Sequence, residues 1–207
     1  MKARRVKFMI VPWEEALSLC KKLAMLIIDD SYYPDVIVTI ARGGFIPARI
    51  VADFLDVREM YSITLKSWGT VERHGPPKVV QPLNVSLKDK RVLIVDEVVD
   101  TGESMEVAFK HVKEIGKPKE IKTAVLHYKT RSKHIPNYYV IKVEEWKWIV
   151  YPWSIHEDIR DLLRRLGDLR SFSVETAIKA LREKYSLTVP KESIKESLMI
   201  YKIKNFK

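Results

Sequence analysis

Apolar residues recur along the chain with two periods, one helical and one typical of strands. Over residues 13–28 they recur every three or four positions, which predicts an amphipathic helix opened by Pro12. The run DVIVTI at 35–40 is short, β-branched and bounded by turn residues, which predicts a buried strand. By the same criteria we predict further helices at 45–56 and 102–116, and further strands at 60–65, 78–83, 91–95, 120–128 and 138–143.

Strand and helix alternate through this region, and such alternation favours an α/β fold. We therefore expect an open, mainly parallel sheet with helices on both faces, formed within residues 1–160. After WIVYPWS the pattern becomes purely helical, with predicted helices at 154–166, 173–185 and 190–202. We expect residues 161–207 to form a helical C-terminal extension that serves packing or subunit contacts.

Composition supports a globular chain and excludes several classes of protein. Of 207 residues, 46% are hydrophobic and 31% charged, which suits a packed core and argues against disorder. No apolar run approaches the roughly 18 residues of a membrane helix, and residues 1–12 lack the apolar segment of a signal peptide. The single cysteine, Cys20, falls on an apolar helical face, so we interpret it as a packing residue of a cytoplasmic protein.

The balance of charge narrows the choice of partners only partly. Lys and Arg number 37 against 27 Asp and Glu, a net charge of +10, which favours an anionic partner. Nucleic acid, a phosphorylated metabolite and an acidic membrane all satisfy this condition. The basic residues are spread along the chain, so most of them are interpreted as solvated surface.

The segment VLIVDEVVDTGES, residues 92–104, combines the features of a sugar site and a phosphate site. It runs from a buried strand through three acids into a helix, and ligands of open α/β sheets sit at the carboxyl ends of strands. The first amides of a helix attract phosphate, the hydroxyls of Thr101 and Ser104 add donors, and Gly102 permits close approach. Together with two adjacent carboxylates, this turn suits a ribose 5-phosphate. The alternative is a strand, an acid-rich turn and a capped helix that bind no ligand.

The segment closely resembles the signature for phosphoribosyl pyrophosphate (PRPP) of the type I phosphoribosyltransferases, in the form of the hypoxanthine-guanine and xanthine-guanine branch. The resemblance implies that Asp96 and Glu97 hold the ribose 2- and 3-hydroxyls. It also implies that Asp100 is the catalytic base near N7 of a purine, and that residues 101–104 bind the 5-phosphate. Glu103 departs from the family, which often has Gly or Lys there, so its side chain must point outward.

A second match follows the strand at 35–40, where the sequence reads Arg42-Gly43-Gly44. The corresponding loop of the family holds pyrophosphate, often through a cis peptide between its middle residues. By this resemblance Arg42 and Gly43 bind pyrophosphate, since glycine permits an unusual backbone and arginine is a charged donor. Taken alone, the tripeptide also fits a plain strand-to-helix turn.

A third match is WKWIVYPW, which resembles the base-covering hood of the bacterial xanthine-guanine enzymes. It implies that Trp148 stacks on the purine and that the backbone of Ile149 reads its edge. Val150 replaces an acid of those enzymes, which leaves the preferred purine open. Trp146 and Trp153 are interpreted as packing residues.

Two further assignments rest on position within the same family. Lys129 matches the lysine that donates to the purine 6-oxo group, and the alternative is a merely exposed lysine. The loop 66–78, with Arg73, His74 and Lys78, matches the mobile hood over PRPP, although a solvated hairpin tip fits it nearly as well.

These features predict a type I phosphoribosyltransferase-like α/β fold and a Mg2+-dependent 6-oxopurine phosphoribosyltransferase. It would convert PRPP and guanine, hypoxanthine or xanthine into the nucleoside monophosphate and pyrophosphate, with Mg2+ held mainly through PRPP and not by direct protein ligands. We expect a homodimer or homotetramer that binds neither membrane nor nucleic acid. Two alternatives stay open: a PRPP-sensing, nucleic-acid-binding regulator on the same fold, and a phosphoribosyltransferase for another base, such as a pyrimidine.

Overall fold

The computed structural model describes residues 6–66 and 76–204, and contacts divide the chain into two compact units. The larger unit is Leu17–Glu145, and the smaller combines Met1–Ala16 with Trp146–Lys207. No helix in the described ranges is long and apolar enough to cross a membrane.

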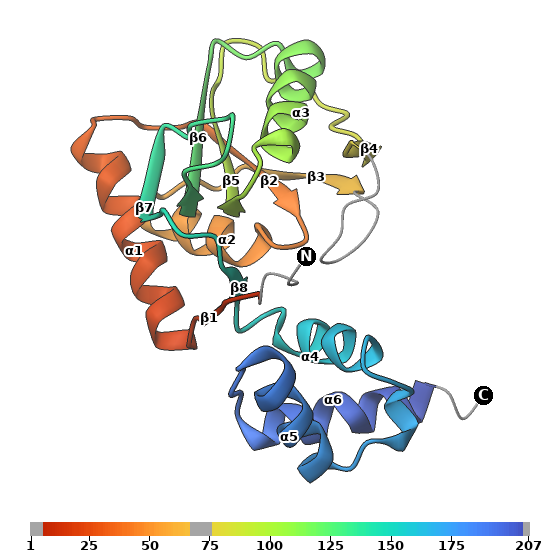
Figure 1. The fold of residues 1–207 in the computed structure, drawn as a ribbon. Coiled ribbons are helices and arrows are strands. Elements are labelled where there is room, and N and C mark those ends of the chain that lie inside the picture. Colours follow the sequence, from red (N-terminus) through yellow and green to blue (C-terminus); the bar gives the residue numbers. More distant parts are fainter. Residues whose placement is uncertain (1–5, 67–75, 205–207) are drawn as a thin grey trace. The chain divides into compact units, whose positions relative to one another are not determined.

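The larger unit is built around a six-stranded sheet (Figure 1). Its strands are β2 (Val36–Ala41), β3 (Met60–Lys66), β4 (Lys78–Gln81), β5 (Arg91–Val99), β6 (Glu120–Lys129) and β7 (Tyr138–Val143). They lie in the order β4-β3-β2-β5-β6-β7, and every neighbouring pair is parallel except β3 with β4. The predicted α/β class with a mainly parallel sheet is therefore confirmed.

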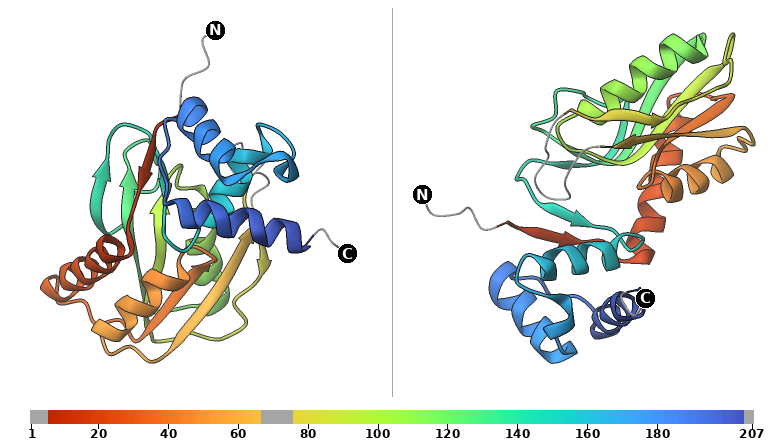
Figure 2. Two further views of the ribbon diagram at one scale, coloured as in Figure 1. Left: turned by 90° about the horizontal axis from the view of Figure 1, so that it is seen from below. Right: turned by 90° about the vertical axis from the view of Figure 1, so that its right-hand side faces the viewer.

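Helices cover both faces of this sheet, as predicted (Figure 2). They are α1 (Trp13–Asp29), α2 (Phe45–Phe54) and α3 (Glu103–His111), and α3 continues as the π-helical turn η1 (Val112–Gly116). On one face α3 packs Met105 and Ala108 into a core with Val38 and Ile94 of the sheet. α1 and α2 lie on the other face, and Cys20 of α1 is fully buried there, as its assignment to packing requires.

Strand β5 extends four residues beyond the predicted 91–95, so the strand does not end before the acids. Parallel pairing with β6 continues through Val98 with His127 and Val99 with Tyr128. Because this pairing satisfies the backbone beyond the apolar run, Asp96 and Glu97 stand within the strand. The prediction was wrong here because it ended the strand where the run of apolar side chains ends.

The smaller unit joins a two-stranded parallel ribbon to a group of helices. Its elements are β1 (Phe8–Ile10), β8 (Trp148–Val150), α4 (Ile155–Arg164), η2 (Leu169–Ser171), α5 (Val174–Tyr185) and α6 (Lys191–Lys204). Ser173 caps α5 by accepting from the N–H of Thr176 at 3.1 Å, at the start of the helix predicted over 173–185.

The helices of the smaller unit share one apolar core. Ile159, Leu162 and Leu163 of α4 pack with Leu181 of α5 and Leu198 of α6, and Phe8 and Ile10 of β1 lie against the same cluster. The predicted domain boundary between residues 160 and 161 falls inside α4. Contacts place the division before Trp146 instead, because α4 buries its apolar face with the helices that follow it.

Candidate functional site

The acids of the signature lie at the carboxyl edge of the sheet, where the parallel strands β2, β5 and β6 all end. Oδ1 of Asp96 accepts the backbone N–H of Glu97 at 2.8 Å. Desolvation, followed by the neighbouring Glu97 carboxylate, raises the pKa of Asp96 well above its usual value. Hydroxyl groups or a cation bound at this edge would relieve the repulsion between the two carboxylates, so the pair suits the predicted role toward a sugar.

The predicted pyrophosphate loop lies beside these acids. β2 ends at Ala41, and the Ala41–Arg42 peptide bond is cis, so the cis bond precedes the first residue of the motif. A Cβ added to Gly43 would lie 2.5 Å from the carboxyl carbon of Glu97. A side chain at position 43 would therefore displace the Glu97 carboxylate, and glycine lets the loop lie against this second acid of β5.

The phosphate turn connects β5 with α3 through a residue in the left-handed region. Gly102 has φ +89° and directly precedes α3, which begins at Glu103. The loop after β6 supports the turn, since the N–H of Lys133 donates to the carbonyl of Thr101 at 3.0 Å. Thr101 and Glu103 are both half-buried, and so is Ser104 in the first turn of α3. The start of α3 therefore lies between the end of β5 and the loop that follows β6.

Asp100 is the point where two basic side chains converge. Nζ of Lys129 donates to its Oδ2 at 2.9 Å, and Nε of Arg131 donates to its Oδ1 at 2.6 Å. Lys129 is only 4% exposed, so the alternative of a surface lysine is wrong. The structure therefore sets a buried donor beside an acceptor at the carboxyl ends of two neighbouring strands.

Arg131 is a site residue that the sequence analysis missed. It follows Lys129 by two positions in KTRSK, in the turn after β6 where the N–H of Ser132 donates to the carbonyl of Lys129 at 2.9 Å. The only signal in the sequence was a basic residue close to Lys129. It carried no weight by itself, because surface loops commonly contain spaced basic residues.

The predicted base-covering residues belong to the smaller unit. The backbone of Trp148 is held by the ribbon, where its N–H donates to the carbonyl of Lys7 at 2.8 Å. Its indole Nε1 donates to Oδ1 of Asp158 at 3.0 Å, and Ile149 is buried beside it. Trp153 stacks on Tyr151 at 4.9 Å between ring centroids, which agrees with a packing role.

The loop assigned to the PRPP hood falls largely outside the described residues. Arg73 and His74 lie in 67–75, of which the structure describes nothing. Lys78 is the first residue of β4 and is exposed. The assignment of this loop stays a prediction.

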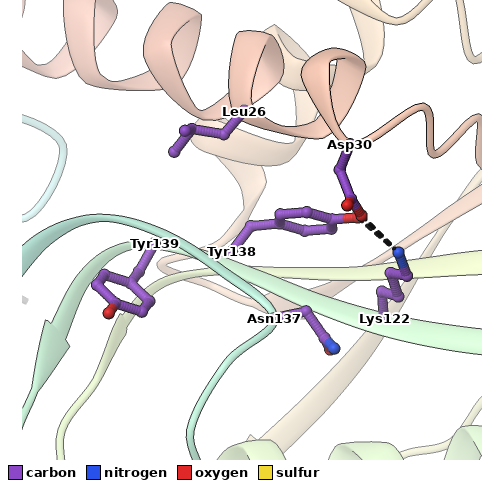
Figure 3. Close-up of a pocket in the computed structure, with 6 residues that line it drawn as sticks. All are labelled: Leu26, Asp30, Lys122, Asn137, Tyr138 and Tyr139. Carbon is purple, nitrogen blue, oxygen red and sulfur yellow. Dashed lines mark hydrogen bonds and ion pairs between the residues drawn. The ribbon is translucent and has the colours of Figure 1, made fainter.

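A pocket of about 270 Å³ lies at the amino ends of β6 and β7, at the opposite edge of the sheet (Figure 3). Its polar groups bond to each other, since Lys122 donates to Asp30 at 2.7 Å and to the hydroxyl of Tyr138 at 2.9 Å. The Tyr138 hydroxyl in turn donates to the same Asp30 oxygen at 2.6 Å. We interpret this group as a structural link from the end of α1 to β6 and β7. The pocket is lined by Leu26, Asp30, Lys122, Asn137, Tyr138 and Tyr139.

Comparison with known proteins agrees with this geometry. Residues 9–160 match the family described as phosphoribosyl transferase domain. The xanthine-guanine phosphoribosyltransferase of Gluconobacter oxydans is 31% identical over 150 residues, which are 72% of this chain and 86% of that protein.

Two solved structures resemble the chain at a similar level. A purine phosphoribosyltransferase from Pyrococcus horikoshii OT3 is 38% identical, with a TM-score of 0.62 over 72% of this chain and 94% of the other. A Neisseria gonorrhoeae protein solved with bound ppGpp is 31% identical, with a TM-score of 0.62 over 73% and 91%. The family match, residues 9–160, spans well over half of the 207 residues, so the chain belongs to the phosphoribosyltransferase family.

Proposed function

We propose that the protein transfers the 5-phosphoribosyl group of PRPP to a 6-oxopurine, forming a nucleoside monophosphate and pyrophosphate. The observation that carries this proposal is the contact between Asp100 and Lys129 at 2.9 Å. A 6-oxopurine base protonated at N7 presents a donor and an acceptor side by side on one edge. A carboxylate next to an ammonium is the complement of that edge.

In the proposed reaction, the base and PRPP supply every bond that forms or breaks, and Asp100 accepts the one proton that is released. As N9 attacks C1 of the ribose, the bond from C1 to the pyrophosphate oxygen breaks and the N7 proton passes to Asp100. An ammonium group has three N–H donors, so Lys129 can keep its bond to Asp100 while it donates to the 6-oxo oxygen. The pair therefore serves base recognition and proton transfer together.

The other site residues would bind the remaining groups of PRPP and the base. Asp96 and Glu97 take the ribose hydroxyls, and the turn from Thr101 to Ser104 takes the 5-phosphate. Arg42 and Gly43 take pyrophosphate, whose position in PRPP next to the ribose matches the approach of Gly43 to Glu97. Trp148 stacks on the base, and the backbone of Ile149 reads its edge.

This edge suits a Mg2+ ion held mainly through PRPP, because the ion prefers oxygen ligands and keeps few protein ligands when it binds substrate phosphates. When bound, Mg2+ would neutralise the pyrophosphate leaving group. Within residues 6–66 and 76–204, no group of three or more His, Cys, Asp or Glu side chains is arranged around a metal position. Asp96 and Glu97 would hold the ribose hydroxyls of the PRPP that carries the ion.

The relatives support a purine acceptor. The Gluconobacter protein is named for xanthine and guanine, and the Pyrococcus protein for purines in general. The Neisseria protein was solved with ppGpp, a guanine nucleotide with a 5′-phosphorylated ribose, which combines the groups assigned here to one site. A purine is therefore favoured over a pyrimidine.

The regulator alternative finds less support in the helices of the smaller unit. Lys191 of α6 pairs with Glu175 of α5, and Lys195 pairs with Glu192 within α6. Nucleic-acid binding requires a continuous basic face, and acids interrupt it at these positions. A sensor also has no need of a donor and an acceptor paired for proton transfer.

The test is pyrophosphate release from PRPP and Mg2+ with a panel of guanine, hypoxanthine, xanthine, adenine and orotate. We expect turnover with one or more 6-oxopurines and none above background with adenine, because sites built to bond a substrate group reject analogues lacking it by about 10⁴–10⁵. Lys129→Ala should raise KM for 6-oxopurines, whereas Lys142→Ala, an exposed lysine of β7, serves as the matched control. Efficient use of adenine or orotate would contradict the proposal, and PRPP binding without turnover of any base would favour the regulator.

A further inference from the structure

The indole ring of Trp148 is fixed from two sides of the smaller unit. Its backbone is part of the β1–β8 ribbon, and its Nε1 donates to Asp158 in the first turn of α4 at 3.0 Å. Oδ2 of the same carboxylate accepts the hydroxyl of Ser154 at 3.1 Å, so both carboxylate oxygens have a donor. Asp158 is 7% exposed, which leaves little water to compete for either bond.

A carboxylate in this position is costly for the fold. Asp158 is buried, and no salt bridge to it is found in the described ranges 6–66 and 76–204. Its charged neighbours Glu157 and Asp161 on the same helix repel it. An uncharged residue at this position would avoid both costs.

We propose that Asp158 is a positioning residue for base recognition: it holds the plane of the Trp148 indole so that one ring face is presented to the purine. The inference rests on the proposed function, which assigns base stacking to Trp148. A tryptophan side chain turns about two bonds, and stacking energy depends on the orientation of the ring. A hydrogen bond to its only polar atom fixes the second rotation, because Nε1 must point at the carboxylate.

If Asp158 positions Trp148, the helices after residue 154 contribute to base recognition. Asp158 is carried by α4, and α4 is held by the apolar core that it shares with α5 and α6. The helices α4, α5 and α6 thereby set the orientation of a side chain that contacts the purine.

A double-mutant cycle between Trp148 and Asp158 tests the proposal in the full-length protein. Stacking of a base on an aromatic ring corresponds to about 5- to 150-fold in affinity, so Trp148→Ala should raise KM for the base within that range. Asp158→Ala should raise the same KM several-fold, with KM for PRPP unchanged within twofold. In the double variant, Asp158→Ala should not change KM for the base beyond the effect of Trp148→Ala, because a residue that acts only through Trp148 then has no ring to position.

Conservative variants separate positioning from loss of fold. Asp158→Asn keeps an acceptor oxygen for the indole N–H and should retain KM near the unmodified value even if Asp158→Ala folds poorly. Asp161→Asn, one turn further along α4 and paired with Arg164 at 2.8 Å, is the matched control and should leave both KM values unchanged.

An NMR measurement reports on the hydrogen bond independently of activity. The chain has five tryptophans, and the indole N–H signal of Trp148 can be identified by its loss in Trp148→Phe. Asp158→Ala should move this signal upfield, and Asp158→Asn should restore part of the shift. An unchanged signal would overturn the inference.

The kinetic outcomes distinguish this inference from the proposed function. The positioning role alone would be overturned if Trp148→Ala raised KM for the base and Asp158→Ala did not. It would also be overturned if the effects of the two changes on KM were fully additive. No effect of Trp148→Ala on KM for the base would overturn the stacking assignment and the positioning role with it.

Discussion

Asp100 has one carboxylate and two basic partners, and this arrangement decides what its replacement should do. Asn at position 100 has nearly the same shape but cannot take up the purine proton. General-base catalysis contributes about 10²–10⁴-fold, so Asp100→Asn should lower kcat by that order. Affinity for PRPP should stay within a few-fold, because the ribose and phosphate contacts are assigned to other residues. Steady-state kinetics and calorimetric titration with PRPP measure the two effects.

Asp35 supplies the control for this change. At the amino edge of the sheet its Oδ2 accepts the backbone N–H of Arg91 at 2.7 Å, and its Oδ1 accepts the guanidinium of Arg91 at 3.3 Å. Asp35→Asn therefore also weakens a carboxylate–arginine contact, but far from the predicted chemistry, and should leave kcat unchanged. Near-native turnover in Asp100→Asn would end its assignment as the base.

Asp158 also makes stability depend on pH in a predictable direction. Desolvation raises its pKa from 3.8 to about 6, although its bonds to Trp148 and Ser154 act the other way. For an acid with a raised pKa the folded state binds the proton more tightly, so stability falls as pH rises from about 4 to 6. The full difference corresponds to about 3 kcal/mol.

Asp158→Asn isolates this contribution, because the amide does not titrate. Both proteins are unfolded with denaturant at pH 4.5 and at pH 7.5. From the lower to the higher pH, the free energy of unfolding of the unmodified protein should fall relative to that of the variant. A difference in the free energy of unfolding that is the same at both pH values would show that Asp158 is not the buried titrating group.

At the scale of single elements, the connection from β5 to α3 is tightly constrained at Gly102. Gly102 has φ +89°, and a Cβ there would lie 2.6 Å from both the backbone nitrogen of His134 and Oγ of Ser132. Gly102→Ala should therefore distort the turn and weaken binding of the 5-phosphate, with a loss of stability of about 1–2 kcal/mol for the left-handed backbone alone. Binding of a nucleoside monophosphate and thermal unfolding provide the measurements.

Gly167 offers a matched glycine outside this turn. Its nearest neighbour would be 3.8 Å from an added Cβ, an ordinary contact with Phe172. Gly167→Ala should leave nucleotide binding unchanged. If Gly102→Ala binds the nucleotide as tightly as the unmodified protein, the turn does not hold the phosphate.

At the scale of the whole molecule, two separate cores support the two groups of predicted site residues. The PRPP residues are carried by the six-stranded sheet, whereas Trp148 belongs to the unit with the α4–α6 core. Leu181→Ala removes a buried side chain from that second core, and such a change costs about 2–5 kcal/mol. We expect a lower unfolding midpoint by circular dichroism with PRPP affinity retained below that midpoint.

Met199→Ala is the corresponding surface change, since Met199 of α6 is 53% exposed. It should shift stability by no more than about 0.5 kcal/mol. Loss of PRPP binding in Leu181→Ala while the protein remains folded would show that the two cores are not energetically separate.

The sequence by itself determined the parts of this protein that depend on local pattern. Alternating strand and helix periods predicted the α/β class and the approximate positions of the helices, including α5. The string around Asp96, Glu97 and Asp100 predicted the edge at which the acids stand, because parallel strands place their carboxyl ends together. Resemblance of this string to the PRPP signature predicted the family.

Tertiary structure alone decided the contacts between segments distant in the sequence. β5 continues past its apolar run because β6 supplies the pairing, and Arg131 meets Asp100 because the two strand ends are neighbours. The bond from Trp148 to Asp158 depends on how α4 packs beside the β1–β8 ribbon. Local residue patterns do not predict such partners, because hydrogen bonds and burial depend on which atoms the fold brings close together.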